Sequence, residues 1–216
     1  VAKWNFNEIS GPTADNAEGT AALDGTLSGF DSTASQDADP DSSWTANNRR
    51  WGAGALQFDG VDSYVSVLDD NTLDFGTSDF SVSAWINTNT NNDNTIIISK
   101  HDDGPPNTGW WLRVTSSGHF QFDTLESGNP SYIDSITAVN TGTWYHVVGI
   151  RDGTSLKIYV NGKLDNSTTD TLRNIDSTYP VNIGARNAGA TQLFNGTIDS
   201  TRIYSRALPA HEILSN

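Results

Sequence analysis

The chain has 216 residues and contains no cysteine. A disulfide framework, a thiolate metal ligand and a cysteine nucleophile are therefore all excluded. A secreted domain without disulfides usually depends on a large core or on bound metal ions instead. The chain also lacks any apolar run of roughly 18 residues, the length that a membrane-spanning helix needs. We therefore expect no insertion into a membrane.

Basic side chains are scarce. Twelve Lys and Arg residues stand against 26 acidic residues, so the formal net charge is −14, and only four of the acidic residues are Glu. Asp suits turns and calcium-binding loops, whereas Glu suits helices, so this bias argues against a helical protein. An acidic surface repels phosphates and anionic lipids, which excludes nucleic acid and membrane surfaces as expected partners.

What the chain does contain is a series of short segments in which apolar and polar residues alternate, each bounded by Gly, Asn, Asp or Ser. This alternation predicts half-buried β-strands. After a first strand over residues 1–7, with Trp4 and Phe6 facing the core, we expect strands near residues 55–59, 63–67, 79–88, 94–100, 109–115, 118–123, 132–137, 143–151, 154–161, 180–184 and 193–204. Only RALPAHEIL, with Pro209 near its first turn, predicts a helix. The expected fold is an all-β antiparallel sandwich with one short C-terminal helix, in a single domain over residues 1–216.

Several phrases in this order resemble one family. They are WNFNEISGPTADNAEG, GALQFDGVDSYVSV, FSVSAWI, GTWYHVVGIRDG, LKIYVNGKL, VNIGAR, FNGTIDSTRIYSRAL and HEI. Together they resemble the LamG-like (laminin G-like) jelly rolls of the concanavalin A-like lectin/glucanase superfamily, over almost the whole chain. The resemblance implies two antiparallel sheets packed face to face, one of them concave, where many relatives bind glycans. Residues 30–48 depart from the family pattern and are interpreted as a loop insertion, which Trp44 and Trp51 would anchor.

No catalytic motif of the superfamily is found. The glucanases that this fold resembles carry Glu-x-Asp-x-x-Glu on one strand, and the lyases carry Arg-x-Glu, Gln-x-His and Tyr-x-Lys-x-Gly-x-Tyr strands; none of these is present. Retaining hydrolysis needs two carboxylates about 5–5.5 Å apart. His146 lies in Trp-Tyr-His-Val-Val, which in this family is typical of a structural histidine. We therefore expect a protein that is not an enzyme.

Acidic loops favour a structural calcium ion, because hard cations take several oxygen ligands from loops. In NGTIDSTRIYS, Ile198 and Ile203 are separated by an odd number of positions, so in a regular strand they would point to opposite faces. For both to face the core, a β-bulge is predicted near residues 199–201. A carboxylate at that bulge would clamp the first loop to the last strand. The candidate calcium ligands are Asp199, Asp15, Glu8 and Asn16. The alternative is that Asp15 and Asp199 only cap turns.

Glycan binding needs exposed aromatic faces and planar polar partners. Alternation places Trp110, Leu112 and Val114 towards the core and turns Trp111 and Arg113 outward. The candidate ligand-binding residues, predicted to line one groove and its rim, are Trp111, Arg113, Arg151, Trp85, Tyr159, His101 and Asp102. The competing interpretation is that such aromatic residues, Trp85 and Trp144 above all, are framework positions of the sandwich.

These observations lead to one leading hypothesis. The chain is interpreted as a non-catalytic carbohydrate-binding module of a secreted or cell-surface protein, tethered to other domains and binding a polysaccharide or other glycan on the concave sheet. The first alternative is an adhesive or structural domain that contacts protein partners. The second is a polysaccharide hydrolase or lyase with an unrecognised site, which two carboxylates converging in the groove would favour.

Overall fold

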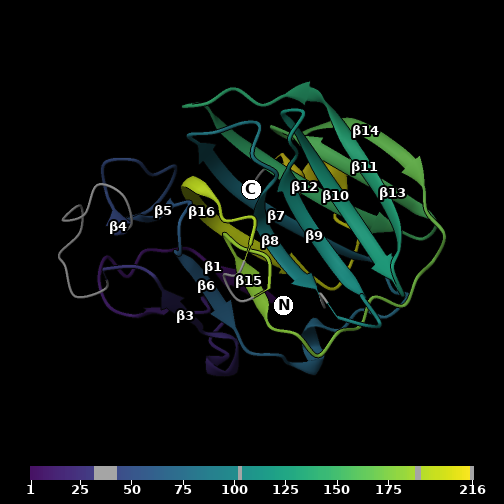
Figure 1. Ribbon diagram of the computed structural model, residues 1–216, viewed down its shortest axis with the longest axis horizontal. Coiled ribbons are helices and arrows are strands. Elements are labelled where there is room, and N and C mark those ends of the chain that lie inside the picture. The colour runs from purple at the N-terminus through teal and green to yellow at the C-terminus, as the bar shows by residue number, and fades with distance from the viewer. Residues whose placement is uncertain (32–42, 102–103, 188–190, 215–216) are drawn as a thin grey trace.

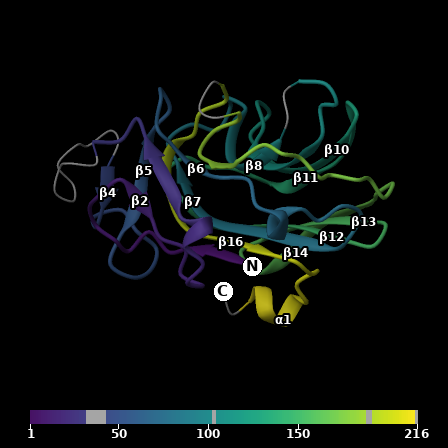
Figure 2. The same ribbon diagram turned by 90° about the horizontal axis from the view of Figure 1, so that it is seen from below.

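The computed structural model describes residues 1–31, 43–101, 104–187 and 191–214. Two eight-stranded sheets pack face to face, and every strand pairing in them is antiparallel. The two layers are visible in Figure 1, and Figure 2 shows the sandwich from below, with one sheet above the other. The predicted all-β sandwich is therefore confirmed.

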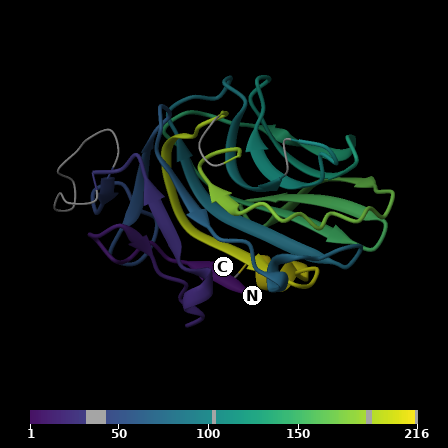
Figure 3. The same cartoon turned by 60° about the horizontal axis from the view of Figure 1, so that its bottom comes forward.

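The first sheet, called here the β7 sheet, has its strands in the order β14-β13-β12-β7-β16-β5-β4, with β1 paired to β16. Its strands are β1 (Ala2–Trp4), β4 (Ser43–Thr45), β5 (Ala55–Asp59), β7 (Phe80–Thr88), β12 (Trp144–Asp152), β13 (Ser155–Val160), β14 (Lys163–Thr169) and β16 (Asn195–Tyr204). Figure 3 shows the long strands β7 and β16 running side by side through this sheet.

The second sheet, called here the β9 sheet, has the order β11-β10-β9-β8-β15-β6-β3-β2. Its strands are β2 (Thr13–Ala14), β3 (Gly25–Ser28), β6 (Tyr64–Val67), β8 (Thr95–His101), β9 (Gly109–Val114), β10 (His119–Glu126), β11 (Asn129–Ala138) and β15 (Val181–Ile183). Two short 3-10 turns, η1 (Ala21–Leu23) and η2 (Asn71–Leu73), and the helix α1 (Ala210–Ile213) complete the described elements. No helix among the described residues has the length and apolar character needed to cross a membrane.

The core lies between the sheets and follows the predicted alternation. The inward residues of β7 are all fully buried, and so are those of β9 and β13. They are Phe80, Val82, Ala84 and Ile86 in β7, Trp110, Leu112 and Val114 in β9, and Leu156 and Ile158 in β13. The layers approach so closely at Gly149 of β12 that an added Cβ would lie 2.4 Å from the ring of Phe122 in β10. A side chain at position 149 would therefore push the sheets apart.

Four strands differ from the sequence-based expectation. The first strand ends at Trp4 rather than at residue 7, and Phe6 adopts a φ of +54° while remaining fully buried. The short strand β2 lies where no strand was predicted, and β4 lies within residues 30–48, which were predicted to be a loop insertion. The polar strand β14, with the sequence KLDNSTT, carries no apolar alternation because it lies at the edge of the β7 sheet. Period-two patterning marks only strands that have one buried face.

The edges of the two sheets are tied together by side chains of β14. The Asp165 carboxylate accepts hydrogen bonds from the backbone N–H groups of Ile136 and Thr137 in β11 of the other sheet. The Asn166 side-chain amide donates to the Asp134 carbonyl oxygen at 2.9 Å. Backbone groups at the edge of β11 are thereby paired without a neighbouring strand.

The C-terminal helix α1 lies outside the β7 sheet, on the side away from the β9 sheet (Figure 2). It begins after Pro209, as predicted. Ile213 and Leu208 pack there with Val148, Ile150 and Tyr159 in a second, smaller apolar cluster. The outer face of β12 and β13 is therefore covered rather than open.

Candidate functional site

Two hollows lie on opposite outer faces of the sandwich. The first, the β9–β11 pocket, has a volume of about 460 Å³ and lies on the β9 sheet. The second, the tryptophan pocket, has a volume of about 490 Å³ and lies on the β7 sheet. Both are of the size typical of small-molecule binding sites in proteins, about 300–1,000 Å³.

Outward side chains of three adjacent strands form the β9–β11 pocket. Its lining residues are Trp111 and Arg113 of β9, Gln121, Asp123 and Leu125 of β10, Pro130, Tyr132 and Asp134 of β11, together with Asn107, Gly128 and Arg186. In the antiparallel register, Arg113 lies opposite Gln121 and Trp111 lies opposite Asp123. Residues that alternate away from the core on neighbouring strands therefore converge on one surface.

Polar side chains in this pocket form a connected chain. Arg113 Nε donates to Gln121 Oε1 at 2.7 Å, and Gln121 Nε2 donates to Asp134 Oδ1 at 2.6 Å. The guanidinium group also lies 3.8 Å from Asp123 Oδ2. This arrangement holds donors and acceptors in fixed positions across β9, β10 and β11, as recognition of a polar ligand requires.

Asp123 is the buried acid of the pocket. Its residue is only 2% exposed, and burial raises the pKa of its carboxyl to about 7, against the opposing charge of Arg113. Near neutral pH the group therefore exists in both forms, and its protonated form can donate a hydrogen bond. Asp134, the second carboxylate of the pocket, also raises the pKa of Asp123.

The Trp111 ring forms the apolar part of this site. It is 8% exposed and packs with Ile96 and Leu125 in a small cluster on the outer face of the sheet. The guanidinium carbons of Arg113 and Arg186 lie 5.5 and 5.1 Å from the centre of its ring, within the range of cation–π attraction. The two arginines hold the Trp111 ring in place and reduce the area of the ring that a ligand can contact.

The predicted single groove is wrong. Trp111 and Arg113 lie on the β9 sheet, whereas Trp85, Arg151 and Tyr159 lie on the β7 sheet. The structure therefore joins Trp111 to Arg113 and separates both from the other three residues. Alternation shows which side chains of a strand point away from the core, but not which of the two sheets contains the strand. For this reason the sequence-based prediction placed all five residues in one groove.

Two of the predicted groove residues are buried inside the protein. Arg151 is 0% exposed, and its guanidinium donates to the carbonyl oxygens of Gly76, Ser78 and Arg173. Tyr159 does point away from the core, as predicted, but α1 and its flanking residues cover it. Neither residue lines the β9–β11 pocket or the tryptophan pocket on the β7 sheet.

The predicted rim is only partly described. His101 is 1% exposed at the end of β8, and its ring meets the Trp111 ring edge-on with centroids 4.5 Å apart. It supports the Trp111 ring from beside the pocket and is not one of the lining residues. Asp102 lies outside the described residues.

Several residues of the pocket were missed by the sequence analysis, in particular Gln121, Asp123, Tyr132 and Asp134. A signal for them existed. Both strands were predicted, and the short hairpin after β9 places Gln121 and Asp123 beside Arg113 and Trp111. The sequence did not indicate that Arg186 lies in this pocket. Arg186 follows β15, and β15 joins the β9 sheet by pairing with β8, which is far away in sequence.

The predicted calcium ligands fall into two separate groups. Glu8 Oε1 accepts the backbone N–H of Asp15 at 3.0 Å, and Asp24 Oδ1 accepts that of Asn16 at 2.7 Å. Burial, with the charges of Asp15 and Asp24 as smaller causes, raises the pKa of Glu8. Glu8 Oε2 is buried and has no hydrogen-bond partner among the described residues. The acidic first loop thus offers an unsatisfied oxygen, although the Asn16 side-chain oxygen already accepts from the backbone N–H groups of Lys3 and Glu18.

The contacts of Asp199 fit the alternative interpretation, in which its carboxylate caps a turn. The expected irregularity is present, since the register of β16 against β7 shifts between Asp199 and Arg202. The carboxylate is fully buried, and its Oδ2 accepts the backbone N–H groups of Arg50 and Trp51, each at 2.9 Å. Ser200 Oγ donates to the other oxygen at 3.0 Å. Among the described residues, no three Asp, Glu, His or Cys side chains form a cluster that would hold a metal.

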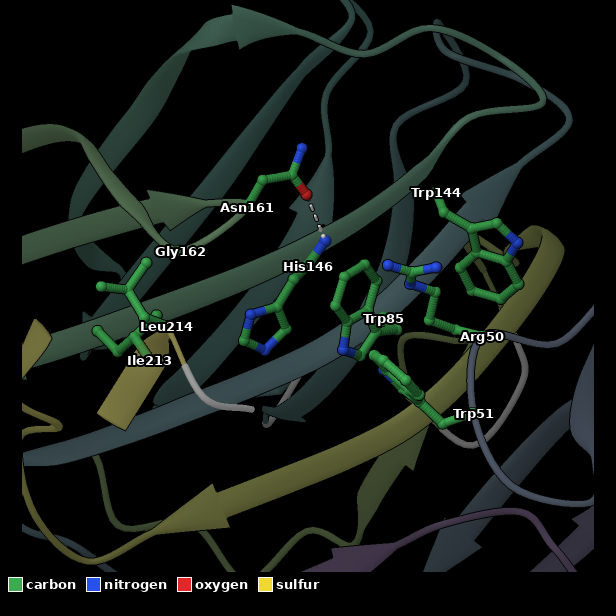
Figure 4. Close-up of a pocket in the computed structure, with 9 residues that line it drawn as sticks. All are labelled: Arg50, Trp51, Trp85, Trp144, His146, Asn161, Gly162, Ile213 and Leu214. Atoms are coloured by element: carbon green, nitrogen blue, oxygen red, sulfur yellow. Dashed lines mark hydrogen bonds between the residues drawn. The ribbon is translucent and has the colours of Figure 1, made fainter. Parts of the chain in front are cut away.

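The turn that Asp199 holds forms one wall of the tryptophan pocket (Figure 4). The lining residues are Arg50, Trp51, Trp85, Trp144, His146, Asn161, Gly162, Ile213 and Leu214. The Trp85 ring stacks on His146, with centroids 5.1 Å apart, and meets Trp51 edge-on at 6.3 Å.

The Trp51 side chain is not the anchor predicted for the insertion, since the residue is 52% exposed. Trp44 is such an anchor: it is 1% exposed and donates its indole N–H to the Gly11 carbonyl oxygen.

Solved structures share this fold at low sequence identity. Domain 4 of AbnA, a GH43 extracellular arabinanase from Geobacillus stearothermophilus in complex with arabinotriose, matches with a TM-score of 0.72 and 19% identity, covering 99% of this chain and 96% of that one. The binding domain of Paraclostridial Mosquitocidal Protein 1 matches with a TM-score of 0.73 and 16% identity over 100% of this chain, which spans only 51% of that structure. The CBM40 of a Ruminococcus gnavus IT-sialidase, bound to α2,3 sialyllactose, matches with a TM-score of 0.56 and 18% identity, covering 64% of this chain and 82% of that one.

A comparison with curated proteins gives no match. A family model for the concanavalin A-like lectin/glucanases superfamily matches residues 58–214, from the end of β5 to the end of α1. This region includes both layers of the sandwich and nearly all of the residues that line the two pockets. The chain therefore belongs to the concanavalin A-like lectin/glucanase superfamily, as a laminin G-like jelly roll.

Proposed function

We propose that the protein is a carbohydrate-binding module and that it binds its glycan in the β9–β11 pocket. The observation that carries this proposal is the row of polar side chains across three adjacent strands, beside the ring of Trp111, which lines the pocket although the residue is only 8% exposed. Arg113, Gln121 and Asp134 are already linked by hydrogen bonds, so their geometry is set before a ligand arrives. A preformed site loses less conformational entropy when it binds.

The chemistry of the pocket suits a sugar. Sugar hydroxyl groups accept hydrogen bonds from guanidinium and amide groups and donate them to carboxylates, and the pocket offers all three. Tyr132, which is 53% exposed on β11, adds an open aromatic ring beside Asp134. The similar solved domains that carry arabinotriose or sialyllactose support a carbohydrate as the ligand class. On this proposal the domain works outside the cell as one module of a larger protein.

The substitution Arg113→Met tests the site. Methionine keeps an apolar side chain at this position but removes the hydrogen bonds of the guanidinium group. Hydrogen bonds to charged groups contribute about 1.5–3 kcal/mol each, so we expect affinity to fall at least about tenfold. The measurement is retardation of the protein in native gels that contain soluble polysaccharides such as arabinan, arabinoxylan or mixed-linkage β-glucan.

Arg206→Met is the matched control for this test. Arg206 is exposed, pairs with Glu212 through a surface ion pair, and lines neither pocket. Its loss should leave both retardation and melting temperature nearly unchanged. Equal retardation of wild type and Arg113→Met, or no retardation of the wild type by any polysaccharide, would show that the pocket does not bind a glycan.

A second candidate function, polysaccharide hydrolysis, is favoured by one observation: Asp123 and Asp134 are two carboxylates in the same pocket. A protonated acid beside an ionised carboxylate is the pair that glycoside hydrolysis uses. Binding is the better-supported function, because Gln121 already engages Asp134 and Asp123 is only 2% exposed. New reducing ends in the polysaccharides of the binding test, absent with Asp123→Asn, would favour the hydrolase instead.

We also propose a structural calcium ion at the acidic first loop. The charges of Asp15 and Asp24 help to raise the pKa of Glu8, and the buried Glu8 Oε2 has no hydrogen-bond partner among the described residues. Because no three acidic side chains of the described residues form a metal-binding cluster, backbone carbonyl oxygens would supply most of the other ligands. Oxygen ligands from carboxylates and backbone carbonyls are what Ca²⁺ prefers. The ion would fasten the loop between β1 and β2 to the body of the sandwich.

Calcium should raise the melting temperature. At a concentration one hundred times its dissociation constant, an ion that binds only the folded state adds about 2.7 kcal/mol, which for a chain of this size is on the order of 5–10 °C. Adding EDTA should remove this increment, and Glu8→Gln should make the protein insensitive to both. Identical melting curves with calcium and with EDTA would contradict a structural ion.

A further inference from the structure

Five of the seven tryptophans form two groups that differ in exposure and in the partner of the indole N–H; Trp110 lies in the core and Trp111 lines the first pocket. Trp4 and Trp44 are at most 1% exposed, and each donates its indole N–H to a carbonyl oxygen, of Leu23 and Gly11 respectively. The indole N–H groups of Trp51, Trp85 and Trp144 donate to no described residue, and all three rings are partly or largely exposed. Of these two groups, the first has the burial and the paired N–H that are typical of structural tryptophans.

The exposed ring of Trp51 is held in place by a buried charge. The Asp199 carboxylate beneath the turn accepts the backbone N–H groups of both Arg50 and Trp51. Arg50 in turn places its guanidinium carbon 4.9 Å from the Trp51 ring centre and 4.6 Å from that of Trp85. Figure 4 shows these three side chains gathered at one side of the hollow, with Trp144 beside them. The Arg50–Trp51 turn is therefore held by several contacts, although the Trp51 ring faces solvent.

The polar groups of this pocket are mostly uncharged. Burial, and secondarily the charge of Arg202, lowers the pKa of His146 to about 4, so the imidazole is neutral at physiological pH and offers one donor and one acceptor. Asn161 lies beside it and accepts the His146 backbone N–H at 2.9 Å. Among the described residues that line the pocket, Arg50 is the single charged side chain and none is acidic. The chain has a net charge of −14, but the described residues that line this pocket include no carboxylate that would repel an anionic ligand.

We propose that the tryptophan pocket is a second carbohydrate-binding site, for a neutral sugar ring, on the face opposite the β9–β11 pocket. The apolar C–H face of a sugar ring would stack on the exposed tryptophans, and its hydroxyl groups would meet Arg50, Asn161 and His146. A hollow of about 490 Å³ accommodates such a ligand. This inference concerns a separate site and does not depend on which ligand the first pocket takes.

Two sites on opposite faces make the domain bivalent. A single molecule would bind two polysaccharide chains, one against each sheet, and so cross-link them. Linked binding events also raise the overall affinity for a surface that presents many copies of a glycan.

Four proteins test this inference: Trp51→Ala, Arg113→Met, the double variant, and Leu68→Ala as control. Leu68 is 77% exposed and lines neither pocket. The probes are soluble neutral polysaccharides, namely arabinan, mixed-linkage β-glucan and galactomannan, in native gels, with light scattering of protein–polysaccharide mixtures. We expect Arg113→Met to keep a residual retardation that the double variant loses, a change of at least about tenfold in affinity. Scattering by cross-linked polysaccharide should require both sites.

The other outcomes separate the two proposed sites. If Arg113→Met abolishes all retardation and Trp51→Ala changes nothing, the second site is overturned and the first stands. If Trp51→Ala abolishes retardation and Arg113→Met changes nothing, the second site stands and the first fails. Absence of retardation for the wild type with every probe overturns both. Because Trp51 is exposed, its replacement leaves the melting temperature nearly unchanged, and this check separates lost binding from lost folding.

Discussion

Replacing Arg151 by alanine is expected to destabilise the protein by about 3–5 kcal/mol, one of the largest effects of any single substitution in the chain. The guanidinium group is fully buried and lies between segments that are far apart in sequence, since its acceptors are the carbonyl oxygens of Gly76, Ser78 and Arg173. It also packs over the Phe80 ring, 5.1 Å from its centre. Alanine would remove the donor of all these carbonyl groups.

The loss is increased by a nearby acid. Burial lowers the pKa of Arg151, and the charge of Asp170 is the largest of the opposing effects. Asp170 is itself 4% exposed and neither of its carboxylate oxygens has a hydrogen-bond partner among the described residues. Removing the cation leaves that charge buried and uncompensated, which is more costly than the loss of the hydrogen bonds alone.

Thermal or urea unfolding measures this effect, and the melting temperature should fall on the order of 10 °C. Arg173→Ala is the control, because its half-buried side chain makes only long hydrogen bonds, of 3.2–3.5 Å, to Ser131 Oγ and the Pro130 carbonyl oxygen. We expect that variant to lose less than about 1 kcal/mol. Equal losses for Arg151→Ala and Arg173→Ala would mean that the buried network contributes nothing specific.

The second large effect is expected for Asp199→Ala, which should cost about 3 kcal/mol and also impair the tryptophan pocket. Burial raises the pKa of Asp199, whereas the hydrogen bonds from Trp51 and Arg50 lower it. Alanine leaves both backbone N–H groups unpaired beneath the turn. The turn then loses the contact that orients the Trp51 ring.

Urea denaturation gives the stability change, and retardation by polysaccharide in the Arg113→Met background gives the change at the tryptophan pocket. Asp199→Asn keeps one carbonyl oxygen as an acceptor and should lie between alanine and wild type in both measurements. Ser200→Ala removes a single donor to the same carboxylate and is the matched control. If Asp199→Ala unfolds at the wild-type urea concentration, the carboxylate does not hold the turn.

The fold was predictable because most strands have one buried face. In β7 and β9 the alternation separates core from surface without ambiguity, and it also placed Trp111 and Arg113 outward. It fails in β12. There Tyr145 and Val147 face the core while Val148 and Ile150 pack beneath the C-terminal helix, so both faces are apolar. Arg151 shares the parity of Val147 and therefore lies on the inner face, which the sequence does not show.

The sites were less predictable for a physical reason. Each pocket combines residues of one sheet with a residue or turn brought in from elsewhere in the chain: Arg186 joins the first, and the Arg50–Trp51 turn joins the second. Such placements follow from strand pairing over long separations, as in β15 with β8 or β16 with β7. A local pattern identifies which side chains leave the core, but not which of them meet.

The bonds from Asp165 to the backbone of β11 have a consequence for how these domains behave at high local density. An open sheet edge is a template on which another chain can add a strand, and repeated addition leads to fibrils. Here the N–H groups of Ile136 and Thr137 are already occupied by a side chain of the opposite sheet, and β14 itself is polar. Many copies crowded on one polysaccharide, or arranged in tandem along one polypeptide, would then present edges that resist strand exchange between neighbours.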